Sequence, residues 1–120
     1  MHKIKGVFSA ALTPINDDLS INKALYLKHC QYLMTQGHDG LAIFGTTGEA
    51  NSLSIKEKCE SIDFLLTHNI DSNLLIPGTG SSSIDDSIKM TKFAAKNKLR
   101  GVLVLPPFYY KNVNDEGIIN

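Results

Sequence analysis

The residues best suited to chemistry form a short turn, Gly45-Thr46-Thr47-Gly48-Glu49. Glycines let the backbone turn sharply, so consecutive N–H groups can point together at an anion. The hydroxyls of Thr46 and Thr47 stand beside those N–H groups, and together they suit a small carboxylate or phosphate better than a cation. An ordinary turn whose threonines bond their own backbone explains the same residues almost as well. Glu49 is expected to hold the loop as a structural acceptor.

A second candidate is the run PFYYK at residues 107–111. A phenol at the end of a strand can pass on a proton or bond a substrate oxygen, provided that it points into a pocket. Aromatic packing at a rim or at an interface between subunits is the alternative. We expect the adjacent Tyr109 and Tyr110 to divide these roles.

Other motifs do not predict a phosphate or metal site. Residues 78–83, GTGSSS, lack the GK[ST] ending of a P-loop, and Ser83 stands where the dinucleotide fingerprint needs a third glycine. A tight turn with a serine helix cap is the better interpretation. The four histidines lie at the terminus, on a predicted helix or in loops at the opposite end, so no metal site is predicted: His2, His29, His38 and His68.

Composition excludes several classes of protein. The 120 residues carry 12 basic and 12 acidic side chains, without a run of either sign, which argues against nucleic acid or a membrane as partner. No apolar run approaches the ~20 residues of a membrane span, so we expect a cytoplasmic protein. Cys30 and Cys59 lie in helical patterns without CxxC spacing, and are expected to be reduced core residues.

Four apolar runs alternate with helical patterns. The predicted strands cover residues 6–12, 40–44, 73–77 and 101–107. Their starts lie roughly 30 residues apart, which is the rhythm of consecutive βα units with a parallel sheet. Two architectures have this rhythm, the doubly wound sheet and the (β/α)8 barrel of about 250 residues. At 120 residues the chain would hold about half a barrel.

The predicted helices begin at polar caps and repeat apolar residues at steps of three and four. One runs from Ser20 to Gly37, Ser54 and Glu57 form a capping box for the next, and Ser83 caps the third. A fourth is expected to start within residues 112–120. The predicted apolar faces are Ile21, Ala24, Leu27, Cys30 and Met34; Ile55, Cys59, Ile62 and Leu66; and Ile84, Ile88, Thr91 and Ala95.

In both architectures ligands bind at the carboxyl ends of the strands, where both candidate runs fall. With these motifs in order, the chain resembles the N-terminal half of the dihydrodipicolinate synthase and N-acetylneuraminate lyase family. The matching segments are GVFSAALTP, GTTGE, PGTG, and PFYYK followed by DEG. The resemblance implies an α/β fold, the first four βα units of a (β/α)8 barrel. Residues 1–120 would be the N-terminal half of that domain, an incomplete barrel truncated in the fourth helix.

The resemblance also implies a function. Members are class I aldolases, synthases or lyases, in which a lysine forms a Schiff base with pyruvate or another 2-oxo acid before an aldehyde reacts. Most are homotetramers, and we expect no cofactor. The position of Thr47 holds the 2-oxo acid's carboxylate, and that of Thr46 lies in a hydroxyl relay with two tyrosines. Tyr110 matches the tyrosine that reaches a neighbouring subunit's site.

Some parts of the family's site have no counterpart here. The Schiff-base lysine belongs to a sixth strand and the second tyrosine to a fifth, so no lysine of this chain matches. A non-catalytic fragment is therefore the alternative. Within the family, a sialic-acid lyase or a 2-keto-3-deoxy sugar-acid aldolase stays open. Ile55 and Lys58 lie in the region where lysine-inhibited synthases carry a histidine, so feedback inhibition by lysine is not expected.

Overall fold

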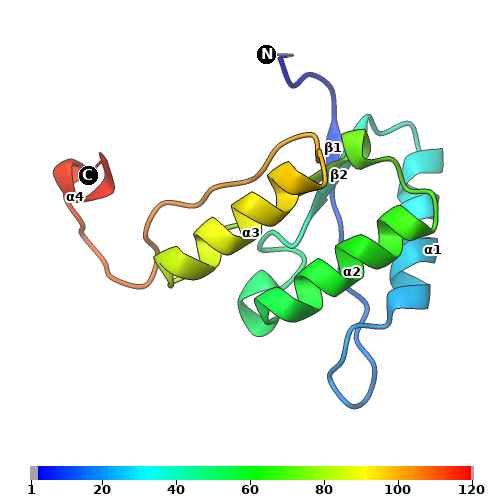
Figure 1. Ribbon diagram of the computed structural model, residues 1–120, viewed down its shortest axis with the longest axis horizontal. Coiled ribbons are helices and arrows are strands. Elements are labelled where there is room, and N and C mark those ends of the chain that lie inside the picture. Colours follow the sequence, from blue (N-terminus) through cyan, green and yellow to red (C-terminus); the bar gives the residue numbers. More distant parts are fainter. Residues whose placement is uncertain (1–2, 120) are drawn as a thin grey trace.

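The computed structural model describes residues 3–119, which build a small parallel sheet with helices packed against it (Figure 1). The strands of this sheet lie in the order β1-β2-β3. Leu41 of β2 lies level with Ser9 on one side and Leu75 on the other. The strands are β1 (Phe8–Ala10), β2 (Gly40–Ile43) and β3 (Leu75–Pro77). Neighbouring strands that are consecutive in the chain and parallel confirm the predicted βα repeat.

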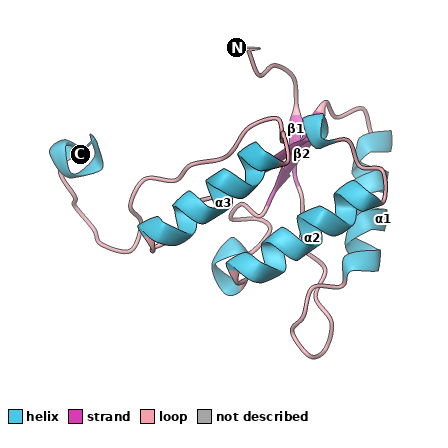
Figure 2. Ribbon diagram, in the orientation of Figure 1, coloured by secondary structure: helices cyan, strands magenta, loops and turns pink. Residues whose placement is uncertain are grey.

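Helices make the connections between strands, and Figure 2 shows the short strands partly hidden behind them. The three long helices have 13 residues each: α1 (Lys23–Thr35), α2 (Ile55–Thr67) and α3 (Ile84–Lys96). A short 3-10 helix, η1 (Ala50–Ser52), precedes α2, and another, η2 (Ser72–Leu74), precedes β3. The five-residue helix α4 (Asp115–Ile119) comes last in the chain. Within residues 3–119, no helix is long and apolar enough to cross a membrane.

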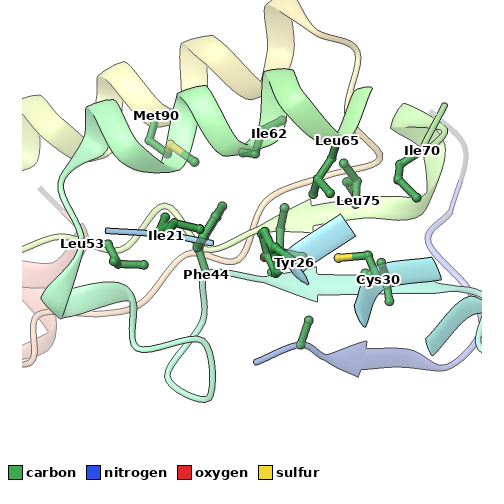
Figure 3. Close-up of a cluster of buried hydrophobic side chains, with 13 residues drawn as sticks. Ile21, Tyr26, Cys30, Phe44, Leu53, Ile62, Leu65, Ile70, Leu75 and Met90 are labelled. Carbon is green, nitrogen blue, oxygen red and sulfur yellow. The ribbon is translucent and has the colours of Figure 1, made fainter. Parts of the chain in front are cut away.

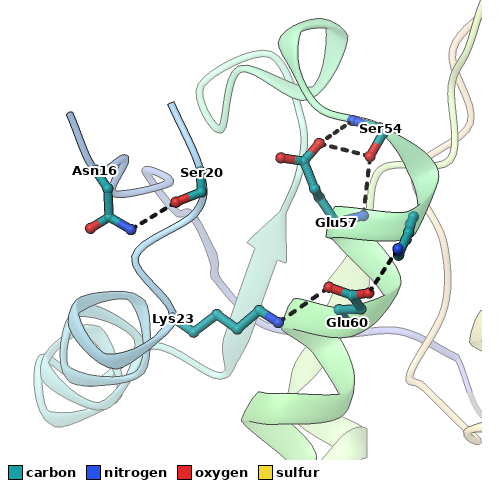
Figure 4. Close-up of polar contacts among 7 residues, drawn as sticks. Asn16, Ser20, Lys23, Ser54, Glu57 and Glu60 are labelled. Atoms are coloured by element: carbon teal, nitrogen blue, oxygen red, sulfur yellow. Dashed lines mark hydrogen bonds and ion pairs between the residues drawn. The ribbon is translucent and has the colours of Figure 1, made fainter. Parts of the chain in front are cut away.

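The helix caps explain where these helices begin. The Ser54 hydroxyl accepts the N–H of Glu57, while a Glu57 carboxylate oxygen accepts the N–H of Ser54 at 2.9 Å, so the predicted capping box is present (Figure 4). Ser83 caps α3 as expected. The prediction for α1 was wrong by two residues, because Asn22 is its cap and Ser20 instead accepts a bond from Asn16 within the preceding loop.

A single core joins the sheet to the three long helices (Figure 3). Leu41 and Ile43 of β2 are fully buried, and Tyr26 packs against Phe44 with ring centroids 5.6 Å apart. Burying each of these large side chains stabilises the fold by about 1.5–3 kcal/mol relative to exposure. The buried helix residues that meet them are Tyr26, Cys30, Ile62, Leu65 and Met90.

Two predicted helix faces differ from the structure. On α3 the buried residues are Met90 and Ala94, while Ile84 is 79% exposed and Ile88, Thr91 and Ala95 are also exposed. This helix carries two apolar stripes, and the core takes the one that faces α2. On α1 the predicted Ala24 is exposed and Tyr26 is buried instead, because its ring fills the space beside Phe44.

The fourth predicted strand, residues 101–107, forms only one bridge, between Gly78 and Leu103. Two bonds hold this point, from the N–H of Leu103 to the carbonyl of Pro77 and from the N–H of Thr79 to the carbonyl of Leu103, each 2.9 Å. The ladder goes no further because β3 is only three residues long and Pro106 and Pro107 have no N–H to donate. Beyond that bridge the chain runs away from the sheet (Figure 1).

Candidate functional site

The candidate turn leaves the carboxyl end of β2 and leads through η1 into α2. Phe44 and Glu49 both have positive φ, 52° and 53°, so the backbone reverses at each end of the turn. The N–H of Glu49 bonds the carbonyl of Thr46 at 3.0 Å, and the N–H of Ala50 bonds that of Gly45 at 3.2 Å. The turn is therefore closed by its own carbonyl oxygens.

Hydrogen-bond donors, by contrast, are left free in this turn. Among the bonds of residues 3–119, none is donated by the N–H of Thr46, Thr47 or Gly48. The hydroxyls of the two threonines likewise have no partner within the described part of the chain, and both side chains are exposed. Within residues 3–119, neither threonine hydroxyl bonds the backbone of its own turn, although the carbonyl of Thr46 accepts the N–H of Glu49. Three consecutive free N–H groups with two hydroxyls suit an anion.

Two supports hold the turn in place, and sequence reasoning missed the first. Thr13, buried after β1, donates from its hydroxyl to the carbonyl of Gly48 at 2.8 Å. A Cβ on Gly48 would lie 3.1 Å from the carbonyl oxygen of Ala11 and from the N of Phe44, so a side chain here would crowd the backbone. The sequence signal for this support was the threonine that follows the first predicted strand.

The second support is Gly78, at the end of β3. Its N–H bonds the carbonyl of Ile43 at 2.8 Å, and a Cβ there would lie only 2.0 Å from the carbonyl oxygen of Phe44. Only glycine permits this approach, because any side chain would push the two strand ends apart. Gly78, the first residue of the predicted tight turn at residues 78–83, thus also fixes where the backbone lies at the start of the candidate turn.

The pockets divide the predicted site residues. Thr46 and Glu49 line a 330 Å³ pocket beside the turn, whose lining also includes Leu103 and Leu105. Thr47 does not line this pocket. Tyr110 lies in a separate 920 Å³ groove along α3, 74% exposed, with its ring 5.2 Å from that of Tyr109 in a T-shaped pair. Thr46 and Thr47 are neighbours in the turn, but only Thr46 lines this pocket and Tyr110 lines a different one, so the roles of all three stay predictions.

Two buried ionisable groups of the core, Tyr26 and Cys30, stay protonated near neutral pH. Burial raises the pKa of the Tyr26 phenol well above its usual value, and burial raises the pKa of the Cys30 thiol to about 12. Neither group therefore offers a charge to a ligand near neutral pH. Across residues 3–119, no cluster of three or more His, Cys, Asp or Glu side chains is placed to hold a metal ion, and His2 lies outside the described residues.

Comparisons with known proteins agree on one family. The model of the dihydrodipicolinate synthetase family matches residues 3–120. A 4-hydroxy-tetrahydrodipicolinate synthase from Bartonella bacilliformis is 34% identical over 115 residues, which is 96% of this chain and 39% of that protein. The chain thus spans about two fifths of the length of the curated relatives it matches.

Solved structures give the same result. The dihydrodipicolinate synthase of Agrobacterium tumefaciens is similar with a TM-score of 0.90 and 28% identity, covering 94% of this chain and 39% of that one. A variant of the 2-keto-3-deoxygluconate aldolase of Sulfolobus solfataricus, in complex with pyruvate, has a TM-score of 0.84 and 27% identity, over 96% and 38%. These similarities confirm the predicted fold, the first βα units of a (β/α)8 barrel.

Proposed function

The chain belongs to the dihydrodipicolinate synthetase family, and on that premise we propose that its protein is a Schiff-base lyase acting on pyruvate or a related 2-oxo acid. The observation that supports this most is the turn after β2. Three free N–H groups and two free hydroxyls meet there, at the strand end where barrel enzymes bind ligands. They match the carboxylate of a 2-oxo acid in charge and in size.

Each threonine has its own part in this proposal. Thr47 would donate its hydroxyl and N–H to the carboxylate, fixing the keto carbon for attack by an amine. Thr46, which lines the neighbouring pocket, would pass protons through its hydroxyl during formation and breakdown of the Schiff base. Tyr110 would complete that relay in a neighbouring subunit, and its exposure on the surface is compatible with this.

The amine itself would come from outside this chain. A class I mechanism needs a lysine whose amine attacks the keto carbon and expels water, leaving a C=N bond. By family resemblance that lysine stands on the sixth barrel strand. Because this chain spans two fifths of its relatives' length, the activity proposed is that of the whole protein.

Borohydride trapping tests the proposal directly. The full-length protein is incubated with pyruvate and reduced, and peptide mapping then locates the adduct. We expect one reduced pyruvyl group on a single lysine of a later strand, and none without pyruvate. Absence of an adduct across the pH range, or an adduct only on surface lysines, would refute the Schiff-base assignment.

Two threonine variants test the division of roles. Thr47→Val keeps the volume and removes a charge-assisted bond worth about 1.5–3 kcal/mol, so pyruvate capture should weaken roughly 10- to 150-fold. Thr46→Val should lower kcat more than pyruvate affinity. Thr67→Val, at the exposed far end of α2, is the matched control and should change neither. If the two site variants behave like the control, the turn is only structural.

The second substrate divides two candidates within the family. The curated relatives favour a 4-hydroxy-tetrahydrodipicolinate synthase, whereas structural similarity to 2-keto-3-deoxygluconate aldolases favours a sugar-acid aldolase. Cleavage of 2-keto-3-deoxygluconate to pyruvate would identify the aldolase. Consumption of pyruvate with an amino-aldehyde, and no sugar-acid cleavage, would identify the synthase.

A further inference from the structure

The phenol of Tyr26 is a buried polar group that lacks a hydrogen bond. The side chain lies on the core side of α1 and is fully buried, and among residues 3–119 no atom bonds its hydroxyl oxygen. Leaving such a group unsatisfied costs free energy, and proteins usually give it a partner. A phenylalanine would fill the same space without that cost, so the hydroxyl itself needs a role.

The hydroxyl of Thr13 is the neighbour that can accept from this phenol. Burial raises the pKa of Tyr26 and the Cys30 thiol raises it further, whereas the Thr13 hydroxyl lowers it, so the two hydroxyls are close neighbours. Thr13 donates its own proton to the carbonyl of Gly48 at 2.8 Å. The lone pairs of the Thr13 oxygen are therefore left to accept a bond.

Tyr26 is placed to act on both ends of the candidate turn. Its ring packs on Phe44, just before the turn, with centroids 5.6 Å apart (Figure 3). Its hydroxyl lies beside Thr13, which bonds the other end of the turn. The start of α1 is also tied to this segment, because the N–H of Asn22 donates to the carbonyl of Pro14 at 2.9 Å. The helix and the two turn ends are thus held as one unit.

The Gly48 carbonyl is linked through the backbone to a free anion donor. It shares a peptide group with the N–H of Glu49, which donates to the carbonyl of Thr46 at 3.0 Å. That carbonyl shares a peptide group with the N–H of Thr47, which donates no bond within the described part of the chain. A planar peptide group turns as a unit, so holding the Gly48 carbonyl helps to set the direction of the Thr47 N–H.

Position matters more than polarisation along this chain of bonds. A hydrogen bond strengthens the next one by about 10–30%, so less than about a tenth of the effect passes through two further bonds. A misplacement of about 1 Å at a binding group, by contrast, can cost about 100-fold. A hydroxyl that restrains Thr13 therefore acts mainly by fixing where the turn lies.

We propose that Tyr26 is a positioning residue for the candidate turn. Its phenol closes onto the Thr13 oxygen, keeps the Thr13 hydroxyl on the turn, and so aims the Thr47 N–H at a carboxylate. Tyr26 touches no substrate in this role. The inference rests on the proposed function, because the carboxylate is that of the 2-oxo acid, and it adds a residue of α1 to the groups that capture it.

Steady-state kinetics of the full-length Tyr26→Phe variant test this role. The change removes only the hydroxyl and keeps the ring beside Phe44. KM for pyruvate should rise about three- to tenfold while kcat stays within about twofold, because binding is weakened and the chemistry is not. The free energy of unfolding should stay the same or rise, because the lost hydroxyl has no partner. Tyr32→Phe, an exposed tyrosine on the same helix, is the matched control and should change none of these quantities. An unchanged KM in Tyr26→Phe would overturn the proposal.

Variants of Thr13 test whether Tyr26 acts through it. Thr13→Val removes the bond to Gly48 and should raise KM for pyruvate more than Tyr26→Phe does. In the Thr13→Val background, Tyr26→Phe should have no further effect, because its link to the turn is already broken. Thr13→Ser keeps the hydroxyl, so the effect of Tyr26→Phe should return. Additive effects of Tyr26→Phe and Thr13→Val would overturn the connection.

A second measurement needs no pyruvate. In the full-length protein with isotope-labelled threonine, NMR follows the backbone amide of each threonine. Tyr26→Phe should shift the amide signal of Thr47 and leave that of Thr67, at the far end of α2, unchanged. An unmoved Thr47 signal would overturn the inference. If the shift occurs but pyruvate trapping fails in the parent, the proposed function is wrong and the positioning of the turn by Tyr26 stands.

Discussion

Replacing Gly78 with alanine should separate the ends of β2 and β3 and so displace the candidate turn. The added Cβ would lie 2.0 Å from the carbonyl oxygen of Phe44 and 2.8 Å from its carbonyl carbon. Ordinary contact needs at least 3.4 Å, so one strand end must move by more than about 1 Å. The neighbouring bond from the N–H of Gly78 to the carbonyl of Ile43, now 2.8 Å, would then lengthen or break.

The expected loss follows from these two effects. Overpacking of this kind costs about 1–3 kcal/mol, and a lost backbone hydrogen bond about 0.5–1.5 kcal/mol more. Gly78→Ala should therefore lower the free energy of unfolding by about 2–4 kcal/mol, measured by urea denaturation. Gly45→Ala is the matched control from the adjacent strand end, because its Cβ would meet nothing closer than 3.9 Å. Its stability should stay within about 0.5 kcal/mol of the parent.

A functional readout accompanies the stability measurement. Phe44 precedes the turn directly, so its displacement should also weaken capture of pyruvate in the full-length protein. If Gly78→Ala is as stable as Gly45→Ala, the close approach of the two strands is not a constraint, and this account of the turn is wrong.

Two further predictions concern the helix cap and the core thiol. Ser54→Ala should lower the free energy of unfolding by about 0.5–2 kcal/mol. The Ser54 hydroxyl also lowers the pKa of Glu57, so the stability that this contact adds is present above the usual carboxyl pKa and is lost as the pH falls. The free energy of unfolding should therefore differ less between pH 7 and pH 4 in the variant than in the parent. Cys30 keeps its proton when folded but ionises when unfolded between about pH 9 and 12, so stability should fall with pH across that window, by up to about 4 kcal/mol. Cys30→Ala should flatten this fall, and an unchanged slope would contradict it.

Local signals in the sequence were enough for much of the fold. The capping box at Ser54 was predictable because it depends on residues three apart, and the strand rhythm because each βα unit carries its own pattern. The buried face of α3 was not predictable, because the pair Ile84 and Ile88 and the pair Met90 and Ala94 are both apolar. Which one is buried depends on where α2 lies, and no local pattern contains that information.

The candidate site divides in the same way. The glycines and threonines of the turn predicted an anion site because backbone N–H geometry is a local property. Thr13 was missed because its bond to Gly48 joins residues 35 apart in the chain.

The order β1-β2-β3 has a consequence for how the protein forms during synthesis. Within residues 3–119, β2 pairs with β1 and β3 with β2, so each of these strands meets a partner made just before it. Closing a loop of some thirty residues carries a modest entropy cost, and contacts that are short in sequence favour fast folding. On the ribosome, α1 can therefore pack on β2, which already pairs with β1, before β3 emerges. Pulse-labelled hydrogen exchange should then find Leu41 and Ile43 protected earlier than Leu103.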